Sequence, residues 1–188
     1  LTVKNKNNLI KNHTKSPDKI IDEIDKINSQ IQIINSQSKN ELSLIKKIFK
    51  DLDKSKKNWK TKTIGDVCEL LYGKGLDKSL RNGNARYPAY GANGIKTYSK
   101  KKLFDKPSII IGRKGSAGEL NYVEKPFWAL DVTYYVRLID GKIDLKFLYY
   151  VLKQQNLPSL ARGVKPGLNR NEVYEISFSL PPLDEQKK

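Results

Sequence analysis

The spacing of apolar residues divides the chain into two parts that meet near residue 59. Between residues 17 and 54, isoleucine and leucine recur at steps that alternate between three and four positions. This spacing predicts one long α-helix, and its persistence over several turns is typical of a coiled-coil seam. The predicted seam consists of Ile20, Ile24, Ile27, Ile31, Ile34, Ile45, Ile48 and Leu52.

The residues before this segment indicate where the helix begins. Ser16 can accept a hydrogen bond from an early backbone N–H, Pro17 suits the first helical position, and Asp18 faces the positive end of the helix dipole. A helix from about residue 17 to about residue 54 would be ~55 Å long. The apolar stripe is interrupted at Ser38 and Glu41, which leaves open a register shift, a bend or a polar site against a partner.

From residue 59 the apolar residues fall in short β-type runs separated by Gly, Pro and Asn. Strands are predicted at residues 107–112, 128–138 and 175–180, and helices at residues 63–71 and 145–155. The fold class is therefore predicted as α+β, a mixed globular domain with a β-sheet and short helices that follows a long coiled-coil-type helix.

Three consecutive parts of the chain are predicted up to residue 182. Residues 1–16 are rich in Lys and Asn and are expected to form a flexible arm. Residues 17–58 form the long helix, and residues 59–182 form the globular domain.

The charge of the chain predicts an anionic partner. Lys and Arg number 36 against 20 Asp and Glu, which gives a net charge of +16 and a pI near 9.7. Nucleic acid and an anionic membrane surface both fit such a charge. Residues 59–188 alone hold 23 basic and 13 acidic side chains, so a basic tail does not account for the excess.

Several classes of protein are excluded by what the sequence lacks. No apolar run approaches the roughly 20 residues that span a bilayer, and no signal-peptide pattern is present, so a cytoplasmic protein that does not insert into a membrane is expected. One Cys and one His exclude a disulfide framework and a four-ligand zinc site made by this chain alone.

Three polar segments of the globular domain are candidates for DNA contact, and the first is residues 87–94. Tyr90 and Asn93 could reach base edges or phosphates, because an Asn side chain can pair with adenine through two hydrogen bonds. The alternative is that Asn93-Gly94 is a hairpin turn and the tyrosines belong to the core.

In the second segment, residues 109–118, a buried strand leads into a Gly-rich loop. Arg113 can form two hydrogen bonds with guanine or phosphate oxygens, and Lys114 and Ser116 follow it. The segment lacks the spacing of a nucleotide-binding Walker loop. The alternative is a solvated hairpin with ordinary surface cations.

The third segment, residues 161–171, is a further Gly-rich loop with cations and amides. Its candidates are Arg162, Lys165, Asn169 and Arg170. The alternative is a charged linker before the last strand. Two such loops in one basic domain would together form a concave surface for a duplex backbone.

No catalytic constellation is found. His13 lies in the predicted arm, and Cys68 lies on the apolar stripe of the predicted helix 63–71, where a core thiol is expected. Asp131 lies between apolar neighbours and is predicted to be a buried acid with a structural hydrogen-bonding role. We therefore expect a non-catalytic protein that holds no metal or cofactor.

Five segments, in their order along the chain, resemble the target-recognition domain of type I restriction-modification specificity subunits. They cover about 130 residues: the run from Trp59 to Gly75, Tyr-Pro-Ala-Tyr-Gly-Ala-Asn-Gly at 87–94, Pro-Ser-Ile-Ile-Ile-Gly-Arg-Lys-Gly-Ser-Ala-Gly at 107–118, Lys-Pro-Phe-Trp at 125–128, and Leu-Pro-Pro-Leu-Asp-Glu-Gln at 180–186.

The resemblance implies a sequence-specific DNA recognition subunit that binds double-stranded DNA with a split target. Methyltransferase (M) subunits would bind S-adenosylmethionine and methylate adenine N6, and restriction/translocase (R) subunits would cleave. The helix at 17–58 would be a spacer that pairs with a second spacer helix, in the same chain or in a homodimer, and residues 183–188 would start the next spacer helix. DNA contact would fall to Tyr90, Asn93, Arg113, Lys114, Ser116, Arg162, Lys165, Asn169 and Arg170.

Two forms of such a specificity subunit remain open at this point: half of a longer subunit, or a half-size subunit that dimerises to bind a symmetric site. Two other classes of protein also remain. One is the recognition domain of a fused methyltransferase-nuclease, and the other is a coiled-coil interaction protein in which the basic domain adds only solubility.

Overall fold

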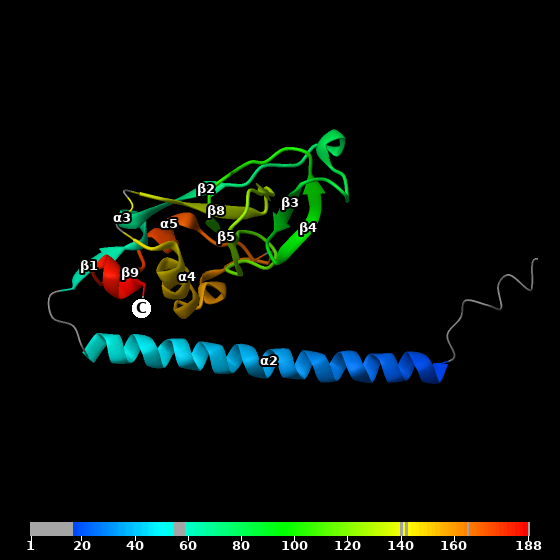
Figure 1. The fold of residues 1–188 in the computed structure, drawn as a ribbon, viewed down its shortest axis with the longest axis horizontal. Coiled ribbons are helices and arrows are strands. Elements are labelled where there is room, and N and C mark those ends of the chain that lie inside the picture. Colours follow the sequence, from blue (N-terminus) through cyan, green and yellow to red (C-terminus); the bar gives the residue numbers. More distant parts are fainter. Residues whose placement is uncertain (1–16, 55–58, 140, 142, 165, 188) are drawn as a thin grey trace, which may run out of the picture. The chain divides into compact units, whose positions relative to one another are not determined.

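The long helix lies where the apolar spacing predicts it. The computed structural model describes residues 17–54, 59–139, 141, 143–164 and 166–187, and α2 spans Pro17–Lys54, a length of 38 residues (Figure 1). The predicted arm at 1–16 lies outside the described residues. The chain divides into two units, the first ending at Ile48 and the second beginning at Phe49. The division into domains given above stays a prediction.

The second unit is built around a four-stranded antiparallel sheet, which confirms the α+β class. The strand order is β2-β8-β5-β6. The bounds are β2 Cys68–Tyr72, β8 Thr133–Leu138, β5 Ser108–Gly112 and β6 Leu120–Val123. Ile109, Ile110 and Ile111 are completely buried, because β5 has a neighbouring strand on each side and apolar packing on both faces.

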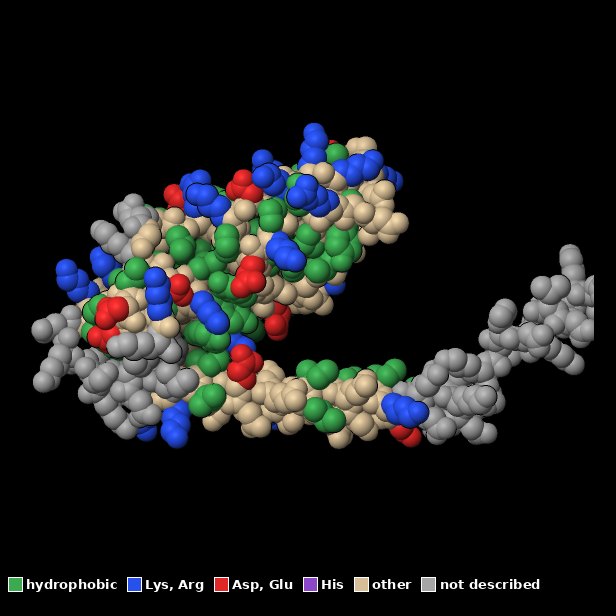
Figure 2. Space-filling view, in the orientation of Figure 1, with side chains coloured by type: hydrophobic (Ala, Val, Ile, Leu, Met, Phe, Trp, Pro, Cys, Tyr) green, Lys and Arg blue, Asp and Glu red, His purple; other side chains and the backbone are tan. Residues whose placement is uncertain are grey.

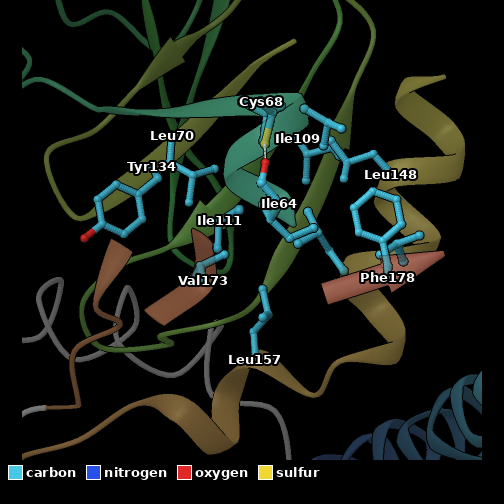
Figure 3. Packing of buried hydrophobic residues seen from close by; sticks show 14 of the residues in the cluster. Ile64, Cys68, Leu70, Ile109, Ile111, Tyr134, Leu148, Leu157, Val173 and Phe178 are labelled. Atoms are coloured by element: carbon cyan, nitrogen blue, oxygen red, sulfur yellow. Dashed lines mark hydrogen bonds between the residues drawn. The ribbon is translucent and has the colours of Figure 1, made fainter. Parts of the chain in front are cut away.

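The two faces of β5 contact two separate apolar cores. Ile109 and Ile111 point into the main core, which also holds Leu148 of helix α4 (Leu145–Gln154) (Figure 3). Ile110 points the opposite way, into a second core around Phe127. This alternation follows from the two-residue period of a strand.

A smaller sheet adjoins the second core. Its order is β4-β3-β7, with β3 Tyr87–Gly91, β4 Gly94–Ser99 and β7 Trp128–Ala129. β3 and β4 form an antiparallel hairpin, and β7 is parallel to β3. The one-turn helix η1 (Lys78–Leu80) precedes this hairpin in the chain.

The remaining elements bring the end of the domain back to its beginning. β1 (Lys60–Thr63) pairs with β9 (Ser177–Leu180), and α6 (Leu183–Gln186) follows. The connecting helices are α3 (Ile64–Val67), η2 (Leu157–Leu160) and α5 (Arg170–Tyr174). Within the described part of the chain, no helix is both long and apolar enough to cross a membrane.

The prediction of a helix at 63–71 is wrong beyond residue 67. Helix α3 ends at Val67, and Cys68 begins β2, which pairs residue by residue with β8. The apolar residues fit a helical period, yet Cys68 and Leu70 are buried on alternate positions of a strand. The long-range pairing with β8 overrides the local pattern.

The predicted strand at 128–138 is two strands with a turn between them. The Thr133 N–H donates to the Leu130 carbonyl at 3.0 Å, which closes the turn after β7. β7 then pairs with β3 while β8 pairs with β2 and β5. The strands predicted at 107–112 and 175–180 and the helix at 145–155 are confirmed within one or two residues.

Candidate nucleic-acid interface

The two Gly-rich loops lie side by side and are joined by backbone hydrogen bonds. The Gly115 N–H donates to the Pro166 carbonyl at 3.2 Å, and the Leu168 N–H donates to the Arg113 carbonyl at 2.9 Å. A β-bridge between Lys114 and Gly167 lies between them. We call residues 113–119 and 161–169 the loop pair. Segments nearly 50 positions apart in the sequence therefore form one surface.

Glycine is required for the shape of the first loop. A Cβ atom at Gly112 would lie 2.0 Å from the Ser116 carbonyl oxygen, and one at Gly118 would lie 2.3 Å from the Pro158 nitrogen. Gly118 also has a φ of +86°, in the left-handed region that other residues rarely adopt. The loop consequently folds back on itself and packs closely on η2.

Arg113 is held in place by two contacts. Its Nε and Nη2 atoms donate to the Asp131 carbonyl oxygen at 3.2 and 2.6 Å, and its guanidinium carbon lies 5.5 Å from the ring centroid of Tyr72. A guanidinium group has five N–H donors. The edge formed by Nη1 and Nη2 therefore stays available for a two-donor contact with a base or a phosphate.

Arg170 also packs against the ring of Tyr72. Its guanidinium carbon lies 5.1 Å from the ring centroid of Tyr72 and 5.8 Å from that of Tyr174, and its Nη1 donates to the Leu70 carbonyl at 3.4 Å. The side chain is half-buried, and its Nε atom is buried without a hydrogen-bond partner in the structure. Arg170 is thus more enclosed than a simple surface cation.

Tyr72 joins these two arginines, although no local pattern in the sequence marks it as a site residue. Its side chain is 50% exposed, and its ring meets that of Tyr134 edge to face at 5.1 Å. The Tyr134 hydroxyl donates to the Leu168 carbonyl at 3.0 Å, and burial raises the pKa of Tyr134 above its usual value. We call Tyr72, Arg113, Tyr134, Arg170 and Tyr174 the Tyr72 cluster.

The other candidates on the loop pair have more varied surroundings. Arg162 is exposed, and its Nη2 lies 3.9 Å from a carboxylate oxygen of Glu172. The Asn169 side chain caps α5 by accepting from the Asn171 N–H at 3.0 Å, so its acceptor oxygen already has a structural role. Lys114 is exposed and Ser116 is half-buried, and Lys165 lies outside the described residues.

The hairpin interpretation of residues 87–94 is confirmed. Gly94 has a φ of +112° after the turn at Ala92 and Asn93. Tyr90 is half-buried, its ring meets that of Phe127 edge to face at 6.1 Å, and burial raises its pKa. Asn93 is exposed at the tip. DNA contact by Tyr90 and Asn93 stays a prediction.

The hairpin tip nevertheless lies against the start of the first loop. A Cβ atom at Gly112 would lie 3.1 Å from the Cβ of Ala92. The Tyr90 carbonyl accepts from the Leu130 N–H at 2.9 Å, and the Arg113 N–H donates to the Val132 carbonyl at 2.9 Å. The first two segments selected from the sequence therefore meet at the turn that joins β7 to β8, and the third is hydrogen-bonded to the second.

The residues considered for catalysis are placed as structural groups. The Cys68 side chain is 1% exposed, its Sγ lies 3.5 Å from the Ile64 carbonyl oxygen, and burial raises the pKa of the thiol to about 12, which confirms a core thiol (Figure 3). Asp131 is exposed, so the prediction that it is a buried acid is wrong. The backbone carbonyl of Asp131, rather than its carboxylate, accepts the hydrogen bond from Arg113. The described residues contain no group of three or more His, Cys, Asp or Glu placed to hold a metal ion.

The domain that contains these loops matches a known protein family. Residues 56–188 match the type I restriction modification DNA specificity domain. The chain belongs to this family. It is similar to the type I restriction enzyme EcoprrI specificity subunit of Escherichia coli, with 26% identity over 133 residues, which cover 68% of this chain and 33% of that protein. This specificity domain thus spans about a third of the length of that relative, whose name describes a specificity rather than a catalytic subunit.

Solved structures resemble the specificity domain in fold. The crystal structure of a type I restriction-modification S subunit from Mycoplasma genitalium has a TM-score of 0.62 and 26% identity, and the match covers 69% of this chain and 36% of that one. The HsdS subunit from Thermoanaerobacter tengcongensis has a TM-score of 0.57, with coverage of 90% and 47%. At 14% identity, the second likeness shows the fold alone.

Proposed function

We propose that this specificity domain recognises a DNA sequence through the loop pair and the Tyr72 cluster. The main support for the proposal is that backbone hydrogen bonds join two cationic Gly-rich loops around Arg113. A rigid backbone holds the guanidinium group, and its remaining donor edge matches the two acceptors of guanine in the major groove. A preorganised donor pair loses little conformational entropy on binding.

The same proposal includes partners that supply the chemistry. The domain would direct two kinds of partner subunit to a split target: methyltransferase subunits, which bind S-adenosylmethionine and methylate adenine N6, and restriction subunits. The complex would act in the cytoplasm. This chain itself would bind no cofactor. The family membership of residues 56–188 supports this assignment.

The long helix supports a spacer role in the proposal. On α2, Ile24, Ile27, Ile31 and Ile34 follow the alternating spacing and are each 48–62% exposed. Ile45 lies on the same helix, as do Ile20, Ile48 and Leu52. Apolar side chains at coiled-coil spacing are stabilised when a second helix covers them. We propose that the partner helix belongs to the same subunit or to a second copy.

The direct test is adenine methylation sequencing of cells with and without the gene. Loss of N6-methyladenine at one split motif is expected when the gene is deleted, and its return on complementation would identify the target. A methylation pattern that is unchanged by deletion would refute the proposal.

A variant tests the surface itself. The double substitution Arg113→Ala with Lys114→Ala should weaken binding to the identified target by about tenfold or more, because one two-donor base contact contributes ~1–3 kcal/mol. The matched control is Lys60→Ala with Lys146→Ala, which removes two exposed cations elsewhere in the domain. Equal losses in the two double variants would contradict a specific role for the loop pair.

A further inference from the structure

Most of the net charge of the globular domain lies outside the loop pair. Residues 74–106, which we call the basic lobe, hold nine Lys and Arg against two Asp and Glu. This is seven of the ten net positive charges of residues 59–188. The candidate contacts derived from the sequence include only Tyr90 and Asn93 from this lobe, and neither is charged.

The cations of the basic lobe are displayed at the surface. Figure 2 shows Lys and Arg side chains gathered over the end of the domain that holds β3 and β4 in Figure 1. All nine are exposed: Lys74, Lys78, Arg81, Arg86, Lys96, Lys100, Lys101, Lys102 and Lys106. A polyanion that approached this end of the domain would meet cations on several adjoining elements.

Only part of this charge is neutralised within the lobe. Lys102 pairs with Asp105 at 3.2 Å, and the hydrogen bond from Lys102 lowers the pKa of Asp105. Lys100 donates to the backbone carbonyl of Ser79 at 2.9 Å, a contact that holds its ammonium group without cancelling its charge. The excess positive charge therefore needs counterions or an anionic partner.

A β-bulge directs Lys96 in this lobe. Ala89 pairs with Thr97 and Tyr90 pairs with Ile95, so Lys96 is the extra residue of β4. Its aliphatic stem lies across Gly91, where a Cβ atom would come within 2.8 Å of Cγ. The bulge and the absence of a side chain at Gly91 thus let the stem of Lys96 lie beside the hairpin tip.

Protection of an open sheet edge does not explain the lysines that follow β4. Lysine is common on edge strands because it blocks pairing with another chain. Here the edge beyond Thr97 is already covered, because the Asn82 N–H donates to the Tyr98 carbonyl at 3.1 Å and the Lys100 N–H donates to the Leu80 carbonyl at 2.9 Å. Lys100 and Lys101 therefore lie where no open edge needs protection.

We infer that the basic lobe is a second DNA-contacting surface that binds the phosphate backbone of the duplex without regard to sequence, while the loop pair contacts the bases. This inference rests on the proposed function, because it assigns a separate task to a second part of the same interface. Phosphate contacts determine affinity and register, and base contacts determine specificity. The hairpin tip, which joins the basic lobe to the loop pair, would bring the two surfaces onto one duplex.

The test compares two triple variants of the full chain that remove the same charge. One carries Lys78→Gln, Lys96→Gln and Lys101→Gln in the basic lobe, and the control carries Lys60→Gln, Lys146→Gln and Lys187→Gln on β1, α4 and the residue after α6. All six side chains are exposed. Binding to a labelled duplex of random sequence is measured over a salt series, together with binding to the identified target.

The lobe variant should lose more of the salt dependence than the control. Each lost phosphate contact lowers the slope of log affinity against log salt by about 0.9, so a decrease of roughly two to three is expected. The ratio of target to random-duplex affinity should stay within about twofold of that of the unmodified chain, since base contacts remain.

Equal slopes in the two triple variants would overturn the inference while leaving the proposed function intact. A fall in the target-to-random ratio in the lobe variant would also overturn it, because the lobe would then contribute to specificity. If the unmodified chain shows no target preference, the proposed function fails instead. Circular dichroism melting of both variants verifies that each is folded.

Discussion

The Arg113 guanidinium group donates two hydrogen bonds to the backbone carbonyl of Asp131, at 3.2 and 2.6 Å. A backbone carbonyl is a better support for a DNA-contacting arginine than a carboxylate would be, because it holds the side chain without neutralising its charge. The Asp131 carbonyl belongs to the turn that joins the two sheets, so both sheets help to orient the guanidinium group.

Replacement of Arg113 by lysine should separate charge from geometry. Arg113→Lys keeps the positive charge but loses the planar group that contacts Asp131 and a base at the same time. We expect target affinity to fall by about tenfold while the salt dependence stays nearly unchanged. Fluorescence anisotropy on the target duplex measures both, with Lys114→Arg as the control. A changed slope with unchanged target preference would contradict this role.

Tyr72 should act through the two arginines that pack on its ring. Tyr72→Ala removes both cation–π contacts, each contributing roughly 0.5–1 kcal/mol at an exposed site, whereas Tyr72→Phe retains the ring. We expect Tyr72→Ala to weaken target binding by about five- to thirtyfold and Tyr72→Phe to bind nearly as the unmodified chain does. Similar losses in both variants would assign the effect to the hydroxyl group instead.

Gly118 should tolerate no side chain. A Cβ atom there would meet the Pro158 nitrogen at 2.3 Å, and the positive φ adds strain, so Gly118→Ala should lower the free energy of unfolding by more than about 2 kcal/mol. Gly75 has nothing within 4 Å of a Cβ position, and Gly75→Ala is the control. Urea denaturation of both measures the difference. Equal stabilities would show that the first loop can move away from η2.

The buried Cys68 thiol should make stability fall in alkaline solution. Burial raises the pKa of Cys68 from 9.0 to about 12 in the folded protein. Between pH 9 and pH 12, the folded state therefore keeps the thiol proton that the unfolded state loses. Its contribution is complete below pH 9 and is lost as the pH rises toward 12. Between pH 9 and 11, the unmodified chain should lose about 1 kcal/mol per pH unit more than Cys68→Ala. Parallel pH profiles from urea denaturation would contradict this.

Gln186 should hold the end of the domain to the start of α4. Its Oε1 accepts from the Asp144 N–H at 2.7 Å and its Nε2 donates to the Pro181 carbonyl at 2.8 Å, and the side chain is 9% exposed. Gln186→Ala should lower the free energy of unfolding by about 1–3 kcal/mol, because buried polar groups lose their partners. Asp184→Ala, at an exposed position two residues earlier, serves as the control in thermal melting, and an equal effect of both would exclude a role for these hydrogen bonds.

Local patterns were sufficient for the elements that depend on local interactions. The long helix has a Pro at its first position and a regular apolar spacing, and its observed bounds agree with the predicted ones. The triple isoleucine of β5 and the apolar face of α4 were equally clear. In contrast, most of β2 was predicted as part of a helix at 63–71, with Cys68 on its apolar stripe, and only β8 supplies the partner that makes residues 68–72 a strand.

For the candidate site, the positions of cations and glycines along the chain were sufficient to select the segments, and their order was sufficient to identify the family. How these segments combine depends on the tertiary fold. Tyr72 gave no signal, because its importance comes from arginines that are 41 and 98 positions away in the chain. Asp131 was chosen for its carboxylate, whereas its backbone carbonyl makes the contact. Composition and period depend on neighbours along the chain, while contacts of this kind arise from long-range packing, which a local pattern does not contain.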